Sequence, residues 1–120
     1  MASRNYQDLL AWQKAMDLAV AVYQLSAAFP SDERFGLTSQ VRRAASSVAF
    51  TIAEGQGQFT KANFKRFLSM AHGSTREVET QVLLAARLSF VDQTRADEAL
   101  QLASETGRLI RGLANSLGEG

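Results

Sequence analysis

The chain has 120 residues, of which 46% are hydrophobic and 21% are charged, with no cysteine, one histidine, one proline and a formal net charge of +1. This length suits a single domain with its own core. The absence of cysteine excludes a disulfide scaffold, thiolate metal sites and a thiol nucleophile. No stretch reaches about 18 consecutive apolar residues, and the N-terminal segment lacks an apolar signal core. We therefore expect a cytoplasmic protein that makes no membrane contact.

Apolar residues at helical spacing predict four helices, over residues 6–28, 35–55, 61–90 and 95–117 of one domain spanning 1–120. In the first helix, Leu18, Val22, Leu25 and Phe29 form one row, and Pro30 ends the element. A second apolar row lies beside it and contains Leu9, Trp12, Met16, Val20 and Tyr23.

The ends of the later helices also have sequence signals. We expect Ser31 to cap the second helix, or, because Gly36 interrupts the start, a short turn at 31–34 to precede it. Gly55 and Gly57 are expected to end this helix by adopting the left-handed conformation. Thr60 is the expected cap of the third helix. The fourth is expected to start with a capping pattern of Thr94 and Asp97, followed by a heptad seam that includes Leu100, Ala103, Gly107, Ile110, Ala114 and Leu117.

Long helices joined by short connections predict an all-α fold, an antiparallel up-down-up-down four-helix bundle. The helices carry more apolar surface than one face each requires. The second row of the first helix is one example, and Ala99, Leu102, Leu109 and Leu113 form another on the fourth helix. Self-association is the simplest way to bury this surplus, although wide buried arcs in a small bundle would also account for it.

A polar strip runs beside the apolar face of the second and third helices. Its members are Gln40, Arg43, Ser47, Glu54, Gly73, Ser74 and Glu77. Because consecutive helices are antiparallel, we predict that Arg43 pairs with Glu77 and that Glu54 pairs with a base of the third helix. Such pairs would set register or assembly geometry more than stability. The strip serves either contacts within one chain or an interface between subunits.

The small net charge conceals a basic middle segment, because residues 41–76 contain six basic residues and one acid. Five of the chain's cationic or potentially cationic groups share one face of the third helix, roughly opposite its apolar stripe: Lys61, Lys65, His72, Arg76 and Arg87. Together with Arg42 they are the candidate nucleic-acid-binding residues, since such a face could follow a phosphate backbone. A solvated helix face is the alternative interpretation.

Catalytic and cofactor motifs are weak in this sequence. The run Glu54-Gly55-Gln56-Gly57 has no third glycine at phosphate-loop spacing and no preceding strand. His72 has no carboxylate or histidine three or four residues away, and Glu77 and Glu79 point to different helix faces. We expect no enzyme activity, no metal and no cofactor.

Three segments resemble the bacterial four-helix bundle family of 23S rRNA-intervening sequence proteins: DLLAWQKAMDLAVAVYQL, FPSDERFGLTSQVRRAASSVAFTIAEGQGQ and FKRFLSMAHGSTREVETQVLLAARL. The resemblance covers residues 6–90 and includes Trp12, Phe29-Pro30, Arg42-Arg43-Ala44 and Ile52-Ala53-Glu54-Gly55. It departs from the family pattern at Thr51 and Gln58.

The resemblance implies protomers that assemble as ring-like homopentamers, and kinship with the accessory variability protein of diversity-generating retroelements, which is thought to bind nucleic acid and a reverse transcriptase. The role of the family is not established. Two functions follow as hypotheses. One is a non-catalytic pentamer that binds RNA or DNA through the basic face. The other is a structural or adaptor oligomer that binds a protein partner and no nucleic acid.

Overall fold

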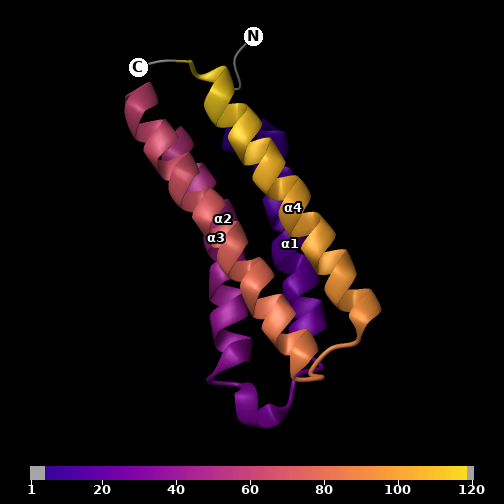
Figure 1. The fold of residues 1–120 in the computed structure, drawn as a ribbon. Helices are drawn as coiled ribbons and strands as arrows, with labels where there is room; N and C mark the ends of the chain where they lie inside the picture. Colours follow the sequence, from indigo (N-terminus) through magenta and orange to yellow (C-terminus); the bar gives the residue numbers. More distant parts are fainter. Residues whose placement is uncertain (1–4, 119–120) are drawn as a thin grey trace.

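The computed structural model describes residues 5–118, which form four long helices and two short 3-10 turns. The helices are α1 (Leu10–Ser26), α2 (Leu37–Gln56), α3 (Lys61–Arg87) and α4 (Gln93–Ser116). The turns are η1 (Tyr6–Asp8) and η2 (Ser31–Glu33). Each helix runs antiparallel to the one before it (Figure 1). The described residues contain no strand, so the prediction of an all-α four-helix bundle is confirmed.

Each helix packs against two others, because α1 contacts α2 and α4, and α3 contacts α2 and α4. The core has two halves. One half is built around Leu18, Val41 and Val82, and the other around Ile52, Leu68 and Ile110. The first apolar row predicted in α1 is fully buried, from Leu18 to Phe29. In the second row, Met16, Val20 and Tyr23 remain exposed, so part of the predicted surplus of apolar surface faces outward.

The first two long helices start later than the sequence predicts. Asn5 caps η1 by accepting a hydrogen bond from the Gln7 amide (2.8 Å), and α1 follows only after that turn. Ser31 lies inside η2, the short turn expected as the alternative, so the prediction that Ser31 caps α2 is wrong. Instead, the Glu33 carboxylate accepts a hydrogen bond from the Leu37 amide (3.0 Å), which satisfies a free donor at the start of α2.

Side-chain caps begin the other two helices. The Thr60 hydroxyl accepts a hydrogen bond from the Asn63 amide (3.1 Å), which confirms the predicted cap of α3. Helix α4 begins two residues earlier than predicted, because Asp92 accepts a hydrogen bond from the Arg95 amide (2.8 Å). The prediction that Thr94 and Asp97 form the cap is therefore wrong. A carboxylate at the start of a helix also interacts favourably with the helix dipole.

The two glycines near the end of α2 act differently from the prediction. Gly57 follows the helix with φ of −78°, in the ordinary helical region, and Gly55 lies within the helix. Gly55 is buried, and a Cβ at this position would lie 2.7 Å from Phe67 Cβ. The absence of a side chain therefore lets α3 approach α2 closely, which is a packing role and not a helix-ending one.

Helix α3 ends in a Schellman motif that has no glycine. The Phe90 amide donates to the Ala85 carbonyl (2.9 Å), and the Ser89 amide donates to the Ala86 carbonyl (3.0 Å). Ser89 occupies the left-handed position with φ of 61°. The chain then turns back through a short connection into α4, so that α3 and α4 lie antiparallel and side by side (Figure 1).

Candidate nucleic-acid interface

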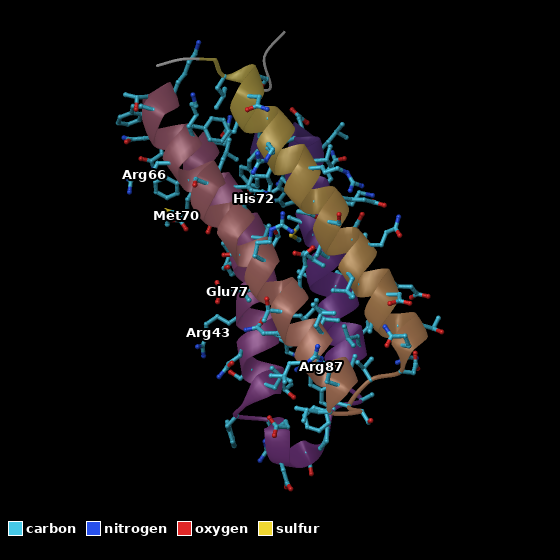
Figure 2. The ribbon with its side chains drawn as sticks, viewed as in Figure 1. Arg43, Arg66, Met70, His72, Glu77 and Arg87 are labelled. Carbon is cyan, nitrogen blue, oxygen red and sulfur yellow. The ribbon has the colours of Figure 1, made fainter. Side chains whose placement is uncertain are left out.

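The predicted basic face of α3 lies on the flank next to α4. Leu68, Ala71 and Thr75 of α3 point into the core and are buried, and His72 between them is half-buried. Figure 2 shows His72 between α3 and α4. The prediction that the basic face is opposite the apolar stripe is therefore wrong. It borders the core, and a second helix forms its other wall.

Two hollows follow one another along the junction of α3 and α4, and both are lined by His72 and Arg111. We call this feature the α3/α4 groove. The polar and charged residues that line it are Lys65, Ser69, His72, Thr75, Arg76, Ser104, Arg108, Arg111 and Asn115. Arg108 and Arg111 come from α4 and were missed in the sequence. Their spacing indicates a shared basic face on α4, because residues three apart on a helix lie at neighbouring positions of one face.

The cations of the groove are only weakly compensated by acids. Arg76 forms an ion pair with Glu79 (2.8 Å) along α3. Arg108 donates a hydrogen bond to the Ser104 hydroxyl (2.9 Å), and Lys65 donates one to the Gly118 carbonyl. The Arg111 side chain is exposed and forms no hydrogen bond or ion pair among the described residues. The groove therefore offers positive charge without a matching set of carboxylates.

His72 of α3 sits beside Gly107 of α4 in the groove. A Cβ on residue 107 would lie 3.6 Å from His72 Nε2, so Gly107 leaves the imidazole room beside the α4 backbone. Burial lowers the pKa of His72 below its ordinary value of 6.5, and the positive charges of Arg76 and Arg111 lower it further, while Glu79 opposes them. His72 is therefore mainly neutral at pH 7 and is the potentially cationic member of the predicted basic face.

The remaining predicted nucleic-acid-binding residues lie apart from the groove lining. Arg42 lies between α1 and α2, where it donates hydrogen bonds to the Ser26 hydroxyl (2.8 Å) and the Tyr23 carbonyl (3.2 Å). Its guanidinium also lies 4.7 Å from the centre of the Tyr23 ring. Lys61 and Arg87 are the first and last residues of α3. At about 1.5 Å of rise per residue, Arg87 is roughly 22 Å along the helix from His72.

The predicted polar strip lies on the other side of α3. The Ser47 hydroxyl donates a hydrogen bond to the Ser74 hydroxyl (3.0 Å), which joins α2 to α3 at this level. One turn away on each helix, Arg43 and Glu77 are both exposed, but no ion pair joins them in the described part of the chain. Arg43 instead donates to the Ser39 hydroxyl (3.5 Å). The predicted pairing of Arg43 with Glu77 is thus not formed within one chain.

The same surface continues in the other direction from the Ser47–Ser74 bond. Phe50 and Met70 lie one turn away and are 64% and 52% exposed. Glu54 and Arg66 follow after another turn, again exposed and without an ion pair among the described residues, so the predicted pairing of Glu54 with a base is not formed either. We call this surface the α2/α3 face. Its members are Arg43, Ser47, Phe50 and Glu54 on α2, and Arg66, Met70, Gly73, Ser74, Glu77 and Leu84 on α3.

Gln40 and Gly73 complete the predicted strip, and both are exposed. A Cβ on Gly73 would meet no atom within 4 Å, so within one chain nothing packs on it. Figure 2 shows Arg43, Arg66, Met70 and Glu77 along one edge of the bundle, away from His72. Helix α3 therefore presents the α2/α3 face on one flank and the α3/α4 groove on the other.

Residues 5–118 contain no group of three or more histidine or acidic side chains arranged to hold a metal ion. Within the same residues, no helix is long and apolar enough to cross a membrane.

The chain matches the model of the 23S rRNA-intervening sequence protein family over residues 7–112, in agreement with the sequence motifs. The structure is also similar to the crystal structure of a protein of unknown function from the S23 ribosomal protein family of Bacteroides thetaiotaomicron VPI-5482. The TM-score is 0.81 at 19% sequence identity, and the alignment covers 88% of this chain and 98% of that chain. At this identity the likeness shows a shared fold. A search of curated proteins found no match.

Proposed function

Because the chain belongs to the 23S rRNA-intervening sequence protein family, whose function is not established, we propose a function from the α3/α4 groove. The protein is a non-catalytic nucleic-acid-binding protein that contacts a phosphate backbone through this groove, in the cytoplasm. The observation that supports this proposal is the convergence of Lys65, Arg76, Arg108 and Arg111 on one groove from two helices.

The form of the groove favours an extended polyanion over a compact one. Its cations are spread along the helix junction, so consecutive phosphates of one strand could each meet a positive side chain. Contacts of this kind position nucleic acid without reading its sequence. We therefore expect binding to RNA or DNA that depends strongly on salt and weakly on sequence.

Assembly is the second part of the proposal, and the α2/α3 face supports it. This face combines exposed Phe50 and Met70 with two sets of opposite charges that form no ion pair within the described chain. A contact with another copy would bury the apolar side chains and could satisfy those charges. We propose that the protomers form the homopentamer implied by the family resemblance. The α3/α4 groove lies on the other flank of α3, outside the α2/α3 face.

The test is a binding measurement with fluorescently labelled RNA and DNA, single-stranded and double-stranded, by fluorescence anisotropy. We expect the doubly neutralised variant Lys65→Gln/Arg111→Gln to bind at least tenfold more weakly than the parent chain. The matched control is Arg34→Gln/Arg95→Gln, which removes two exposed cations outside the groove. Equal losses in both variants would mean that overall charge, and not the groove, attracts the nucleic acid.

The alternative function is an adaptor oligomer that binds a protein partner, and exposed Met16, Val20 and Tyr23 of α1, outside the α2/α3 face, are the observation that favours it. It predicts an intact oligomer that binds no nucleic acid near physiological salt. Light scattering with and without a nucleic-acid mixture distinguishes the two functions, because it reports the mass of the assembly and of any complex together.

A further inference from the structure

His72 occupies the centre of the α3/α4 groove, where it lines both hollows together with Arg111. On α3, Arg76 lies one turn beyond it, Lys65 lines one of the two hollows with it, and Glu79 is the acid whose charge acts on it. On α4, the helix packed against this flank, Arg108 and Arg111 are the charged residues that line the same hollow as His72. Gly107 places no side chain between the imidazole and the α4 backbone. The imidazole is thus reached from the groove and faces mostly positive groups.

This arrangement disfavours a positive imidazole. Burial and the charges of Arg76 and Arg111 hold the pKa of His72 below 6.5. A phosphate in the groove would offset the charge of both arginines and offer an oxygen that accepts a hydrogen bond from a protonated ring nitrogen. The same phosphate that the arginines attract would therefore favour the protonated form of His72.

We propose that His72 is a phosphate ligand of the groove, and that it takes up a proton when a backbone phosphodiester binds beside Arg76 and Arg111. This inference rests on the proposed nucleic-acid binding and adds a specific residue and a pH dependence to it. Arg111 is free to contribute because no described residue pairs with it. Arg76 contributes through a guanidinium that Glu79 holds along α3.

The direction of the effect follows from linkage. If binding raises the pKa of His72, the complex holds more protons than the free protein at mildly acidic pH, so binding tightens as the pH falls. Each unit by which binding raises this pKa corresponds to up to tenfold in affinity. The fixed charges of the arginines do not change over this range, so they contribute no such dependence.

The chain has a single histidine, so one imidazole NMR signal reports its protonation without ambiguity. The imidazole signal is titrated with pH in the free protein, with a short uridine oligonucleotide bound, and with inorganic phosphate, all at matched ionic strength. We expect the midpoint to lie below 6.5 in the free protein and to move upward with the oligonucleotide. Binding followed by anisotropy should tighten several-fold on mild acidification.

The variant His72→Gln cannot take up a proton, so it should lose the gain in affinity on acidification. Arg34→Gln lies outside the groove and should keep that gain. If the oligonucleotide binds but the imidazole midpoint stays in place and His72→Gln keeps the gain, the inference is overturned while the proposed function stands. If the oligonucleotide does not bind at any pH, the proposed function fails. A midpoint moved by inorganic phosphate alone would then assign the site to free phosphate, and an unmoved one would overturn the phosphate site as well.

Discussion

His72 connects the groove to the stability of the bundle, because the same contacts that lower its pKa disfavour its charged form in the folded state. The unfolded chain has no such contacts, so its histidine titrates near the ordinary value of 6.5. Below that value the unfolded state binds more protons than the folded state. The stability associated with neutral His72 is therefore fully present above this value and is lost as the pH falls through the folded-state pKa.

Replacing His72 with glutamine should remove this contribution to the pH dependence. We expect the free energy of unfolding of the parent chain to fall between about pH 7 and about pH 5, and that of the variant to fall less. Chemical denaturation followed by circular dichroism at several pH values measures both slopes. Glu105 titrates at lower pH, since hydrogen bonds from Gln101 and Lys14 lower its pKa below 4.5, so its effect is separable. Identical slopes for parent and variant would contradict this account of His72.

Gly55 provides a second test at the scale of single residues. An alanine Cβ here would lie 2.7 Å from Phe67 Cβ and 3.1 Å from Phe64 Cδ1, and a Cβ cannot rotate away. We expect Gly55→Ala to lower the free energy of unfolding by about 1–3 kcal/mol through overpacking, despite the higher helix propensity of alanine. Gly112→Ala is the control, because its Cβ meets no atom within 4 Å, and it should stabilise by up to about 1 kcal/mol. Thermal or urea denaturation measures whether each variant is less or more stable than the parent chain.

At the scale of elements, α3 ends at a left-handed position that is occupied by Ser89 and that glycine would adopt more easily. Ser89 adopts φ of 61°, a conformation that costs a residue with a side chain about 1–2 kcal/mol and costs glycine little. Ser89→Gly should therefore raise the free energy of unfolding by about 0.5–1 kcal/mol, after the greater freedom of glycine in the unfolded chain is subtracted. Urea denaturation measures the change. A destabilised variant would mean that the serine side chain contributes more than the backbone strain costs.

The α2/α3 face, which is formed by two helices, yields a prediction about self-association. Reversing one charge with Glu77→Arg should weaken self-association, because the proposed contact pairs Glu77 with Arg43 of a neighbouring copy and like charges repel there. Adding Arg43→Glu restores opposite charges and should recover assembly, measured as molar mass by light scattering. An oligomer unaffected by Glu77→Arg would remove this face from the assembly, while circular dichroism verifies that the variants remain helical.

The helices show which features of the fold can be predicted from a single sequence. Apolar spacing predicts all four helices because the core stripe of each follows the helical period, and Thr60 is predictable because a hydroxyl cap acts within one turn. The start of α4 was misplaced because Asp92 and Thr94 are both good caps, and the helix uses the earlier one. Only the α3 side of the α3/α4 groove is predictable from the sequence. Its α3 residues share one helix face, but the contribution of Arg108 and Arg111 depends on how α4 packs against α3, which periodicity within one helix does not specify.

At the scale of the whole molecule, the antiparallel order places α3 between α2 and α4, so one helix serves two surfaces. Four of the six basic residues of the middle segment divide between them, with Arg43 and Arg66 on the α2/α3 face, and Lys65 and Arg76 in the α3/α4 groove. An assembly through the first surface would repeat the second around the oligomer. Several modest grooves acting on one strand would bind far more tightly than one groove alone.

The central claim is that the α3/α4 groove binds a phosphate backbone, and the salt dependence of binding tests it most directly. The logarithm of the affinity for single-stranded RNA falls linearly with the logarithm of salt concentration, by about 0.7 for each phosphate that the protein neutralises. We predict a shallower slope for Lys65→Gln/Arg111→Gln than for the parent chain, by about 0.7 for each phosphate that the variant no longer neutralises, and an unchanged slope for Arg34→Gln/Arg95→Gln. A parent slope near zero, or the same slope in the parent and the groove variant, would contradict the claim.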